Sequence, residues 1–336
     1  MSRISIKDIA KKAGVCIGTV SRVINNMDRV HPETREKIRK LIEETGYRPN
    51  SAGRALVSGK TQNVLLVVHN IADPYCAAIS KIFSSRWHDL GFKMLLGDSN
   101  YDSELEREHL ARARDGSVDG LIVSPIPGCD NNATYRKMIK SGFPFVTIDN
   151  RVETVRTHCV KYDDHAAAGI AIEYLAGKGH KHIAFVNSRP EYQTVKDRYA
   201  GYVETMNRMK LPIRDEFLAP LPKKLQETAE AVQQLVHQKP TPTALLAENE
   251  IMAMVCMNTL LRIGLRIPQN IAVIAIGDTL TDHFAPVPMT TVSLRQDLMC
   301  QKAVRILSQL MENPGQTQEK AIQEIVQPEL IIRNSA

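Results

Sequence analysis

Seven short apolar segments, with helix-like stretches between them, constrain the fold of this 336-residue chain more than any other feature. Their positions are 64–68, 93–97, 120–124, 145–148, 182–186, 243–247 and 271–276. Near-continuous apolar strands that alternate with helices are typical of parallel sheets covered by helices on both faces. Because the stretch after residue 61 is long for one such sheet, we expect two similar α/β lobes.

The sequence lacks the patterns that would indicate a cofactor, a metal or a nucleophilic enzyme. No G-x-G-x-x-G follows a predicted strand, and neither a P-loop nor a G-x-S-x-G turn occurs. His165, His180 and Cys159 are scattered residues that suggest a nucleophile pair, but no metal-spaced cluster accompanies them. The six cysteines lie far apart without a C-x-x-C pair, so we expect reduced and mostly buried thiols. A cytosolic α/β enzyme is therefore an alternative, not the main hypothesis.

The first residues, MSRISIKDIAKKAG, lack the continuous apolar core of a secretory signal. No uncharged apolar stretch of membrane-spanning length occurs elsewhere. We therefore expect a cytoplasmic protein with no membrane partner. A sugar-transport binding protein is a second alternative, and it would require export.

Positive charge is concentrated at the start of the chain. Residues 1–60 carry 13 Lys and Arg against 6 Asp and Glu, whereas the remainder carries 30 against 31. A basic head on a near-neutral body is typical of a module that binds a polyanion such as DNA. A solvated basic surface without a partner is the simpler alternative.

The basic head also has the pattern of a helix-turn-helix. In IKDIAKKAGVCIGTVSRVIN the apolar residues suit two short helices packed at an angle, with Gly14 in the turn between them. An ordinary pair of packed helices would give the same pattern. A third helix is predicted over 32–45, with Pro32 in its first turn and Gly46 at its end.

Four collinear blocks, KDIAKKAGV, TVSRVIN, PETREKI and GYRPN, closely resemble the LacI/GalR (lactose/galactose repressor) family. The resemblance implies a DNA-binding transcription regulator in which Ile17, Gly18 and Arg22 read base edges. Of these three residues, only Arg22 has a guanidinium group, which can donate two hydrogen bonds to guanine. Further residues are implied as phosphate contacts: Ser5, Thr19, Ser21, Asn25 and Thr34. His31 departs from the serine usual before Pro32, which puts side-chain capping of the third helix in doubt.

The stretch 49–61 reads PNSAGRALVSGKT and is predicted to be a hinge. The resemblance implies that it folds on the DNA minor groove, where Leu56 inserts as a wedge and Ala52 and Arg54 lie against the groove. A plain linker is the alternative. Gly53 departs from the usual alanine and costs a helix about 1 kcal/mol.

For the rest of the chain the resemblance implies a periplasmic-binding-protein-like core with a small effector in its cleft. Ligands of open parallel sheets bind beyond the carboxyl ends of the strands. The resemblance and the strand ends together give these candidate effector residues: Asp73, Tyr75, Asp149, Arg198, Asn249 and Asp278. Each of three candidates has a simpler alternative role. Arg198 could form a surface ion pair with Asp197 or Glu204. Asn249 could be a turn residue, and Tyr75 could be a core residue.

Two departures bear on the effector. The family position that bonds ligand is Gly277 here, so Asp278 replaces it only if the loop shifts. Aromatic residues are expected to be few in the cleft, with Trp87 in the core or at a dimer surface. A sugar-like effector is therefore weighed against a nucleobase, a phosphorylated metabolite or no ligand. Control by a partner protein, as in the family's catabolite control proteins, is a further alternative.

These expectations combine into one domain plan. Residues 1–48 form the DNA-binding domain, 49–61 the hinge, and 62–336 the effector-binding and dimerisation core. We expect the first lobe over 62–160 and 291–322, and the second over 161–290 and 323–336. The chain ends in ELIIRNSA without a leucine-heptad tail, so the expected assembly is a homodimer on a pseudo-palindromic operator.

Overall fold

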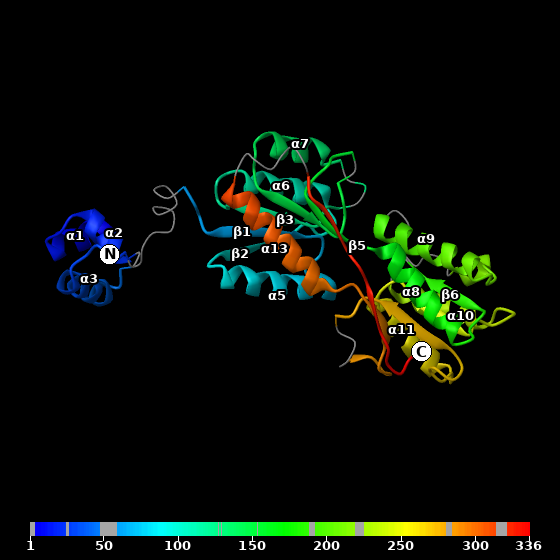
Figure 1. Cartoon of the computed structure of the whole chain (residues 1–336). Helices are drawn as coiled ribbons and strands as arrows, with labels where there is room; N and C mark the ends of the chain where they lie inside the picture. The colour runs from blue at the N-terminus through cyan, green and yellow to red at the C-terminus, as the bar shows by residue number, and fades with distance from the viewer. Residues whose placement is uncertain are drawn as a thin grey trace. The chain divides into compact units, whose positions relative to one another are not determined.

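The computed structural model describes residues 4–24, 27–47, 59–126, 128, 130–152, 154–187, 192–218, 225–279, 284–313 and 321–336. The chain divides into two compact units, Met1–Gln62 and Asn63–Ala336. Figure 1 shows the three helices of the first unit and the two lobes of the second. No helix in the described ranges is long and apolar enough to cross a membrane.

The first unit is the predicted three-helix head, made of α1 (Ile6–Ala13), α2 (Ile17–Ile24) and α3 (Pro32–Thr45). Gly14 ends α1 with a φ of 71°, a left-handed conformation that glycine adopts without strain. The short helices are held together by one small apolar core, which contains Ile9, Ala10, Ala13, Val20, Val23 and Ile38. The apolar pattern in the sequence therefore predicted this core correctly, with Val15 at its margin.

The first lobe of the second unit contains a six-stranded sheet with the order β10-β5-β4-β3-β1-β2. All its strand pairs are parallel. The helices α5 (Pro74–Asp89) and α13 (Gln296–Glu312) cover one face, and α6 (Ser103–Ala113) and α7 (Asn132–Lys140) cover the other (Figure 1). The strands are β1 (Asn63–Val68), β2 (Lys93–Asp98), β3 (Gly120–Val123), β4 (Phe145–Ile148), β5 (Cys159–Tyr162) and β10 (Gln323–Val326).

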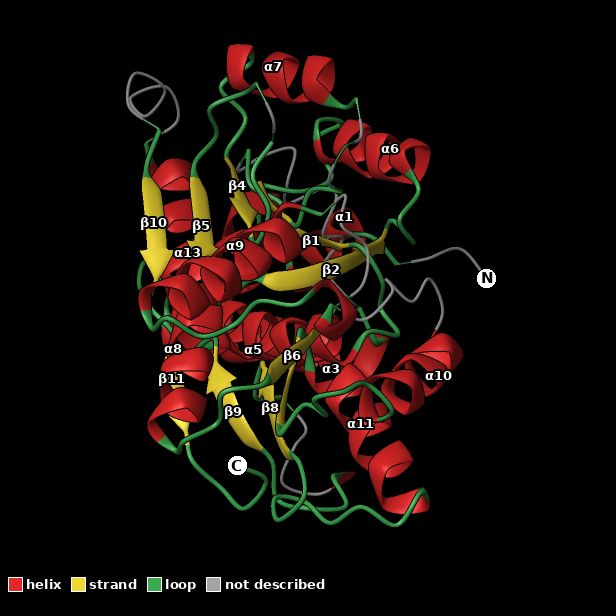
Figure 2. Cartoon of the chain, turned by 90° about the vertical axis from the view of Figure 1, so that its right-hand side faces the viewer, coloured by secondary structure: helices red, strands yellow, loops and turns green. Residues whose placement is uncertain are grey.

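The second lobe contains a five-stranded sheet with the order β11-β9-β8-β7-β6. Its pairs are parallel except that of β11 with β9. Helices lie on both faces of these strands (Figure 2). The strands are β6 (Ile183–Val186), β7 (Ala244–Ala247), β8 (Ala272–Ile276), β9 (Thr290–Ser293) and β11 (Glu329–Ile331). The helices are α8 (Asp164–Gly177), α9 (Gln193–Arg208), α10 (Leu225–Val236), α11 (Glu250–Arg262) and the 3-10 turn Asp215–Phe217.

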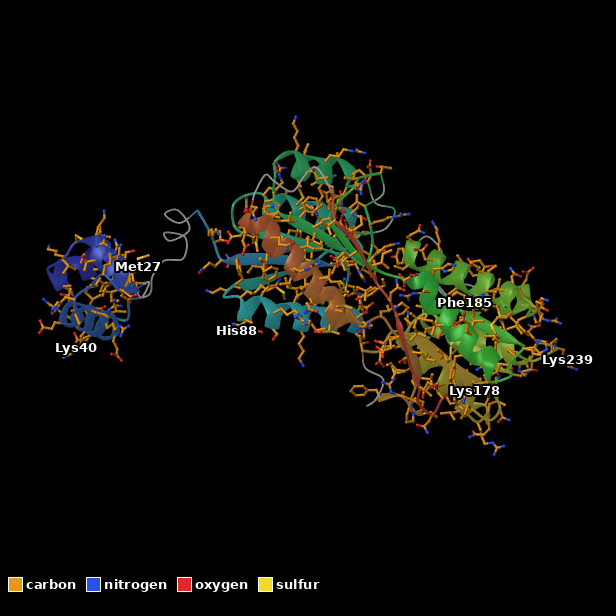
Figure 3. All side chains as sticks on the ribbon, in the orientation of Figure 1. Met27, Lys40, His88, Lys178, Phe185 and Lys239 are labelled. Carbon is orange, nitrogen blue, oxygen red and sulfur yellow. The ribbon has the colours of Figure 1, made fainter. Side chains whose placement is uncertain are left out.

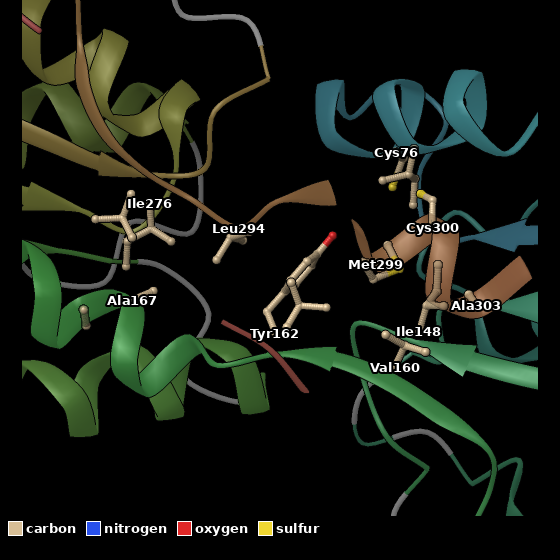
Figure 4. Packing of buried hydrophobic residues seen from close by; sticks show 14 of the residues in the cluster. Cys76, Ile148, Val160, Tyr162, Ala167, Ile276, Leu294, Met299, Cys300 and Ala303 are labelled. Carbon is tan, nitrogen blue, oxygen red and sulfur yellow. The ribbon is translucent and has the colours of Figure 1, made fainter. Parts of the chain in front are cut away.

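The chain crosses between the lobes after β5, after β9 and after β10. Because β9 pairs in the second sheet and β10 in the first, the crossings fall a few residues later than the expected boundaries at 160, 290 and 322. The expected boundaries followed the ends of the recognisable strands, and the polar residues of β5, β9 and β10 kept these crossing strands from being recognised. Tyr162 and Leu294 lie beside two of the crossings, between the buried side chains of the two lobes (Figure 4).

Trp87 and four of the five described cysteines are buried in this core. Trp87 packs edge-on against Phe92, with their ring centroids 5.5 Å apart. Cys16, in the head, is the exposed exception. The expected burial of most thiols is therefore confirmed, and Trp87 is a core residue.

Candidate DNA-binding surface and effector cleft

The second helix of the head presents the three predicted base-reading residues to solvent. Val20 and Val23 anchor one side of α2 in the apolar core, whereas Ile17, Gly18 and Arg22 are exposed. Ile17 is 43% exposed, so its side chain is accessible to a partner. Basic side chains such as Lys40 extend from other faces of the head (Figure 3). The geometry suits a helix that inserts into the major groove.

Ser5 has a structural role that the sequence reading did not assign. Its hydroxyl donates to Asp8 Oδ2 at 2.7 Å, and Asp8 Oδ2 also accepts from the Ser5 backbone N–H at 2.9 Å. This capping box begins α1 and satisfies N–H groups that the helix leaves open. The same hydrogen bonds lower the pKa of Asp8. A phosphate contact by Ser5 would therefore come from a residue that already fixes the start of α1.

The other predicted phosphate contacts that the structure describes have similar exposure. Thr19, Ser21 and Thr34 are half-buried, and the Thr19 hydroxyl lies 3.2 Å from Cys16 Sγ. His31 precedes α3 without a side-chain capping bond, which confirms the doubt raised by its sequence. The remaining predicted DNA contacts lie outside the described residues: Asn25, Ala52, Arg54 and Leu56.

The second unit holds a cleft of about 520 Å³ between its two lobes. Residues after the carboxyl ends of β1, β2, β4, β7 and β8 line it, as expected for open parallel sheets. Of the predicted effector residues, the structure brings five into this cleft: Asp73, Tyr75, Asp149, Arg198 and Asn249.

Arg198 is the central cation of the cleft. Its Nε donates to Asp164 Oδ1 at 2.7 Å, and its Nη1 donates to the backbone oxygen of Glu248 at 2.5 Å. The side chain of Asp164 is 4% exposed, so this ion pair is shielded from water. The surface pairing considered from the sequence is wrong, because Asp197 accepts from Gln193 and Glu204 pairs with His165.

Asp149 is held in an unfavourable state. Its φ of 63° lies in the left-handed region, which aspartate tolerates better than most residues. Burial and the nearby charge of Asp164 raise the pKa of Asp149 to about 7, while Arg198 acts in the opposite direction. At neutral pH this carboxyl group is therefore ready to accept a hydrogen bond, or to donate one when protonated.

Asp73 and Asn249 begin the helices that point at the cleft. Asp73 Oδ1 accepts from the Tyr75 N–H at 2.8 Å at the start of α5, and Asn249 Oδ1 accepts from the Met252 N–H at 2.8 Å at the start of α11. Both residues therefore serve as N-caps while they line the cleft. The Tyr75 hydroxyl donates to the Tyr162 hydroxyl at 3.2 Å, which orients the Tyr75 ring.

Asp278 does not reach the cleft, and its prediction as an effector residue is wrong. Its carboxylate pairs with Arg333 Nη1 at 3.0 Å and accepts from Thr291 at 3.0 Å, which turns it away from the opening. Gly277 lines the cleft instead, with a φ of 110°. A Cβ at Gly277 would lie 3.3 Å from Glu250 Oε2. A carboxylate is therefore present beside Gly277, and α11 supplies it.

The expectation of few aromatic residues in the cleft is also wrong. Tyr101 and Tyr192 line it together with His69 and Tyr75. The rings of Tyr101, which follows β2, and Tyr192, which precedes α9, are stacked at 6.1 Å with an angle of 11° between their planes. Because these residues belong to different lobes, the stacked pair spans the cleft.

Sequence reasoning missed several polar residues of the cleft. Asn150 and Glu248 come directly after strands that were recognised, so their positions could have been found with the rule that gave Asp149 and Asn249. Thr228 lies inside α10 and Gln296 begins α13, away from any recognised strand end. No pattern in the sequence pointed to these two residues.

Two family models match the chain. The model for bacterial regulatory proteins of the lacI family matches residues 5–50, and the model for the periplasmic binding protein-like domain matches residues 172–336. The chain therefore combines a DNA-binding domain of the lacI type with a periplasmic-binding-protein-like domain. The fold and the resemblance expected from the sequence are thereby confirmed.

Known transcription regulators also resemble the chain over nearly its whole length. The transcriptional regulator DegA of Bacillus subtilis is 29% identical, over 98% of this chain and 97% of DegA. The transcriptional repressor PurR of Pasteurella multocida is 28% identical, over 98% of each chain. These relatives are transcription regulators and not enzymes, which agrees with the DNA-binding regulator expected from the sequence.

Two solved structures of transcription regulators have the same fold. The complex of the regulator CelR with cellobiose has a TM-score of 0.71 at 25% identity, and covers 99% of this chain and 100% of CelR. The Lac repressor dimer bound to operator and the anti-inducer ONPF has a TM-score of 0.85 at 22% identity, and covers 99% of each chain. The second likeness concerns the fold alone.

Proposed function

We propose that this LacI-family protein is a cytoplasmic repressor that binds a pseudo-palindromic operator as a homodimer and is controlled by a small sugar-like effector. The effector binds in the cleft between the lobes. The observation that carries the proposal is one chain with both an exposed helix-turn-helix and a polar cleft at the carboxyl ends of two parallel sheets.

The polar composition of the cleft supports a sugar-like effector. Asp149, Arg198 and Asn249 offer acceptors and donors within one cavity, and the aromatic rings of Tyr101 and Tyr192 provide apolar faces. Hydroxyl-rich ligands use both kinds of surface. Cellobiose, the ligand in the CelR complex, is therefore a reasonable first compound for a binding test.

The three crossings between the lobes support allosteric control. A ligand that contacts both lobes favours their closed arrangement, and it acts only through its differential affinity for the two arrangements. Movement of the first lobes within a dimer then changes how the hinge segments 49–61 meet the DNA. Whether the effector releases or strengthens DNA binding is an outcome of the experiment below.

An exposed apolar sheet edge supports dimerisation. β2 is an edge strand of the first sheet, and its Leu95 and Leu96 are 43% and 40% exposed. Leu90, just before this strand, is 53% exposed. Edge strands with exposed leucines are normally covered by another surface. A second copy of the chain is the partner that we propose.

The decisive experiment is selection of bound sequences from random DNA by the purified full-length protein, repeated with a panel of sugars. We expect an enriched motif with two inverted half-sites, and a change in affinity for that motif when one sugar is present. Enrichment of no motif would contradict sequence-specific repression. An enriched motif whose affinity no sugar changes would contradict the sugar effector alone.

A further inference from the structure

Three side chains in the cleft have buried polar atoms without hydrogen-bond partners. They are Asn150 Oδ1, Thr228 Oγ1 and Gln296 Nε2. The exposed fractions of these residues are 7%, 0% and 7%. The described part of the chain contains six such atoms, so half of them belong to residues that line one cavity. Buried polar groups are nearly always paired, and each unpaired one needs an explanation.

The three side chains come from both lobes. Asn150 follows β4 and Gln296 begins α13, both in the first lobe, whereas Thr228 lies in α10 of the second lobe. Each is fixed by its own element, so the three atoms were not brought together by local sequence. A molecule that pairs with all three would contact both lobes at once.

We propose that Asn150, Thr228 and Gln296 are effector contacts that link the two lobes when the ligand binds. The inference rests on the proposed function, because it assumes that the cleft holds an effector, and it adds contact residues that the family resemblance did not indicate. The amide oxygen of Asn150 accepts a hydrogen bond, the amide nitrogen of Gln296 donates one, and the Thr228 hydroxyl does either.

The charges of the cleft define the class of the ligand. Four carboxylates line it, those of Asp73, Asp149, Glu248 and Glu250. Arg198 is the only lysine or arginine among the described lining residues, and Asp164 already neutralises it. A phosphate ester would bring negative charge toward these carboxylates, whereas an uncharged polyol donates hydroxyl hydrogen bonds to them. The effector is therefore an uncharged, hydroxyl-rich compound.

The first test needs no knowledge of the ligand. Groups reserved for a ligand destabilise the free protein, so near-isosteric removal of the unpaired atom stabilises it. We expect Thr228→Val and Gln296→Met to raise the melting temperature of the ligand-free full-length protein by about 2–4 °C. A lower melting temperature for both variants would overturn the proposal, because it would mean that both atoms have partners in the free protein.

The matched control is Thr290→Val. Thr290 is also fully buried in the second lobe, but its hydroxyl accepts from the Arg333 backbone N–H at 3.0 Å. Removal of this paired hydroxyl leaves a buried donor unsatisfied, so the melting temperature of the control falls. Opposite shifts for Thr228→Val and Thr290→Val identify the unpaired atom as the cause.

The second test is calorimetric titration with matched neutral and phosphorylated sugars: cellobiose, glucose and ribose against glucose 6-phosphate and ribose 5-phosphate. We expect a neutral sugar to bind, its phosphate to bind at least tenfold more weakly, and Thr228→Val and Gln296→Met each to weaken the neutral sugar about 3- to 10-fold. Equal affinity of the variants and the wild type would overturn the contact residues, and tighter binding of a phosphate would overturn the ligand class. If no sugar binds the wild type, the sugar-effector proposal fails, and the melting temperatures alone decide on the contact residues.

Discussion

The carboxyl group of Asp149 sits in left-handed backbone, is buried, and lies near the charge of Asp164. Each of these circumstances costs stability, and such costs persist mainly where a site needs them. Arg198 offsets only part of the charge, because Asp164 already binds its guanidinium. Asp149 therefore lowers the stability of the folded core, and in return it places a polar group in the cleft where a ligand could bind.

The first prediction concerns the pH dependence that follows from Asp149. Its pKa of about 7 lies above its ordinary value near 3.8, so the folded state binds the proton more tightly than the unfolded chain. The stability that this group contributes is fully present below about pH 4 and is lost as the pH rises toward 7. Asp149→Asn removes that loss. We expect the variant to match the wild type near pH 5 and to exceed it at pH 8 by on the order of 2 kcal/mol.

Urea denaturation followed by tryptophan fluorescence measures this difference in the full-length protein, because Trp87 is the only tryptophan and is buried in the first lobe. Other titrating groups are common to both proteins and cancel in the comparison. A constant difference between the variant and the wild type at pH 5 and pH 8 would show that Asp149 has only a structural role.

A second prediction at this scale concerns Arg22, the one exposed residue on α2 with a bidentate fork. Its guanidinium matches the major-groove edge of guanine, whereas Ile17 and Gly18 offer an apolar contact and backbone access. Arg22→Ala should lower the affinity for the selected operator by about 1–3 kcal/mol and remove base preference at one position in each half-site. Selection from random DNA measures both effects. Arg39→Ala, on α3, is the control and should weaken binding without changing the motif.

At the scale of elements, the seven apolar strands were predictable, whereas the four strands with polar residues were not. β5, β9, β10 and β11 read CVKY, TTVS, QEIV and ELI, and their polar residues interrupt the apolar run by which a buried strand is recognised. These strands flank the crossings, where both sheets share the chain. Their pairing depends on tertiary contacts, so local sequence contained too little signal to place the lobe boundaries.

The cleft shows the same limit for side chains. Asp149 and Asn249 follow strong strands, and the strand-end rule placed them correctly in the cavity. Asp278 obeys the same rule but is drawn away by Arg333, which lies 55 positions later in the chain. An ion pair between such distant positions cannot be read from one sequence. Gln296 was missed for the same reason, since only the folded chain brings α13 to the cleft.

The prediction for an element concerns the start of α3. His31 occupies the N-cap position without a side-chain capping bond, and its backbone is non-helical, with a φ of −56° and a ψ of 139°. His31→Ser should provide an oxygen for the open N–H groups of the first turn and stabilise the helix by about 1 kcal/mol. Amide hydrogen exchange in the full-length protein measures this gain. We expect roughly fivefold stronger protection of the amides near Ile38 in the His31→Ser variant than in the wild type. His31→Ala is the control, and equal protection in both variants would contradict a capping gain.

At the scale of the whole molecule, the two lobes of the second unit are joined on more than one side of the cleft. The stacked rings of Tyr101 and Tyr192 join the lobes across the cleft, and the crossings near Tyr162 and Leu294 join them behind it (Figure 4). Small changes at the cleft can therefore alter the angle between two rigid sheets, since packed lobes move as bodies and not by gradual deformation.

A movement of the lobes affects DNA binding only through the proposed dimer. A substitution in β2 tests whether this strand forms the dimer contact. Leu96→Lys places a charge on the exposed apolar edge of the first sheet without disturbing a buried side chain. In a symmetric dimer both copies carry the change, so each would bury an unpaired ammonium group. We expect the dimer to weaken by on the order of 3 kcal/mol, which is about 100-fold in the dissociation constant.

Sedimentation velocity at micromolar concentration measures this shift from dimer to monomer, while Trp87 fluorescence verifies that the first lobe stays folded. Leu105→Lys is the matched control, because Leu105 is 37% exposed on α6 and not on the edge strand itself. It should leave the dimer intact. A Leu96→Lys protein that remains dimeric and still binds two inverted half-sites would place the dimer contact elsewhere. A monomer that binds only one half-site would show that the dimer formed through β2 is needed to bind the whole operator.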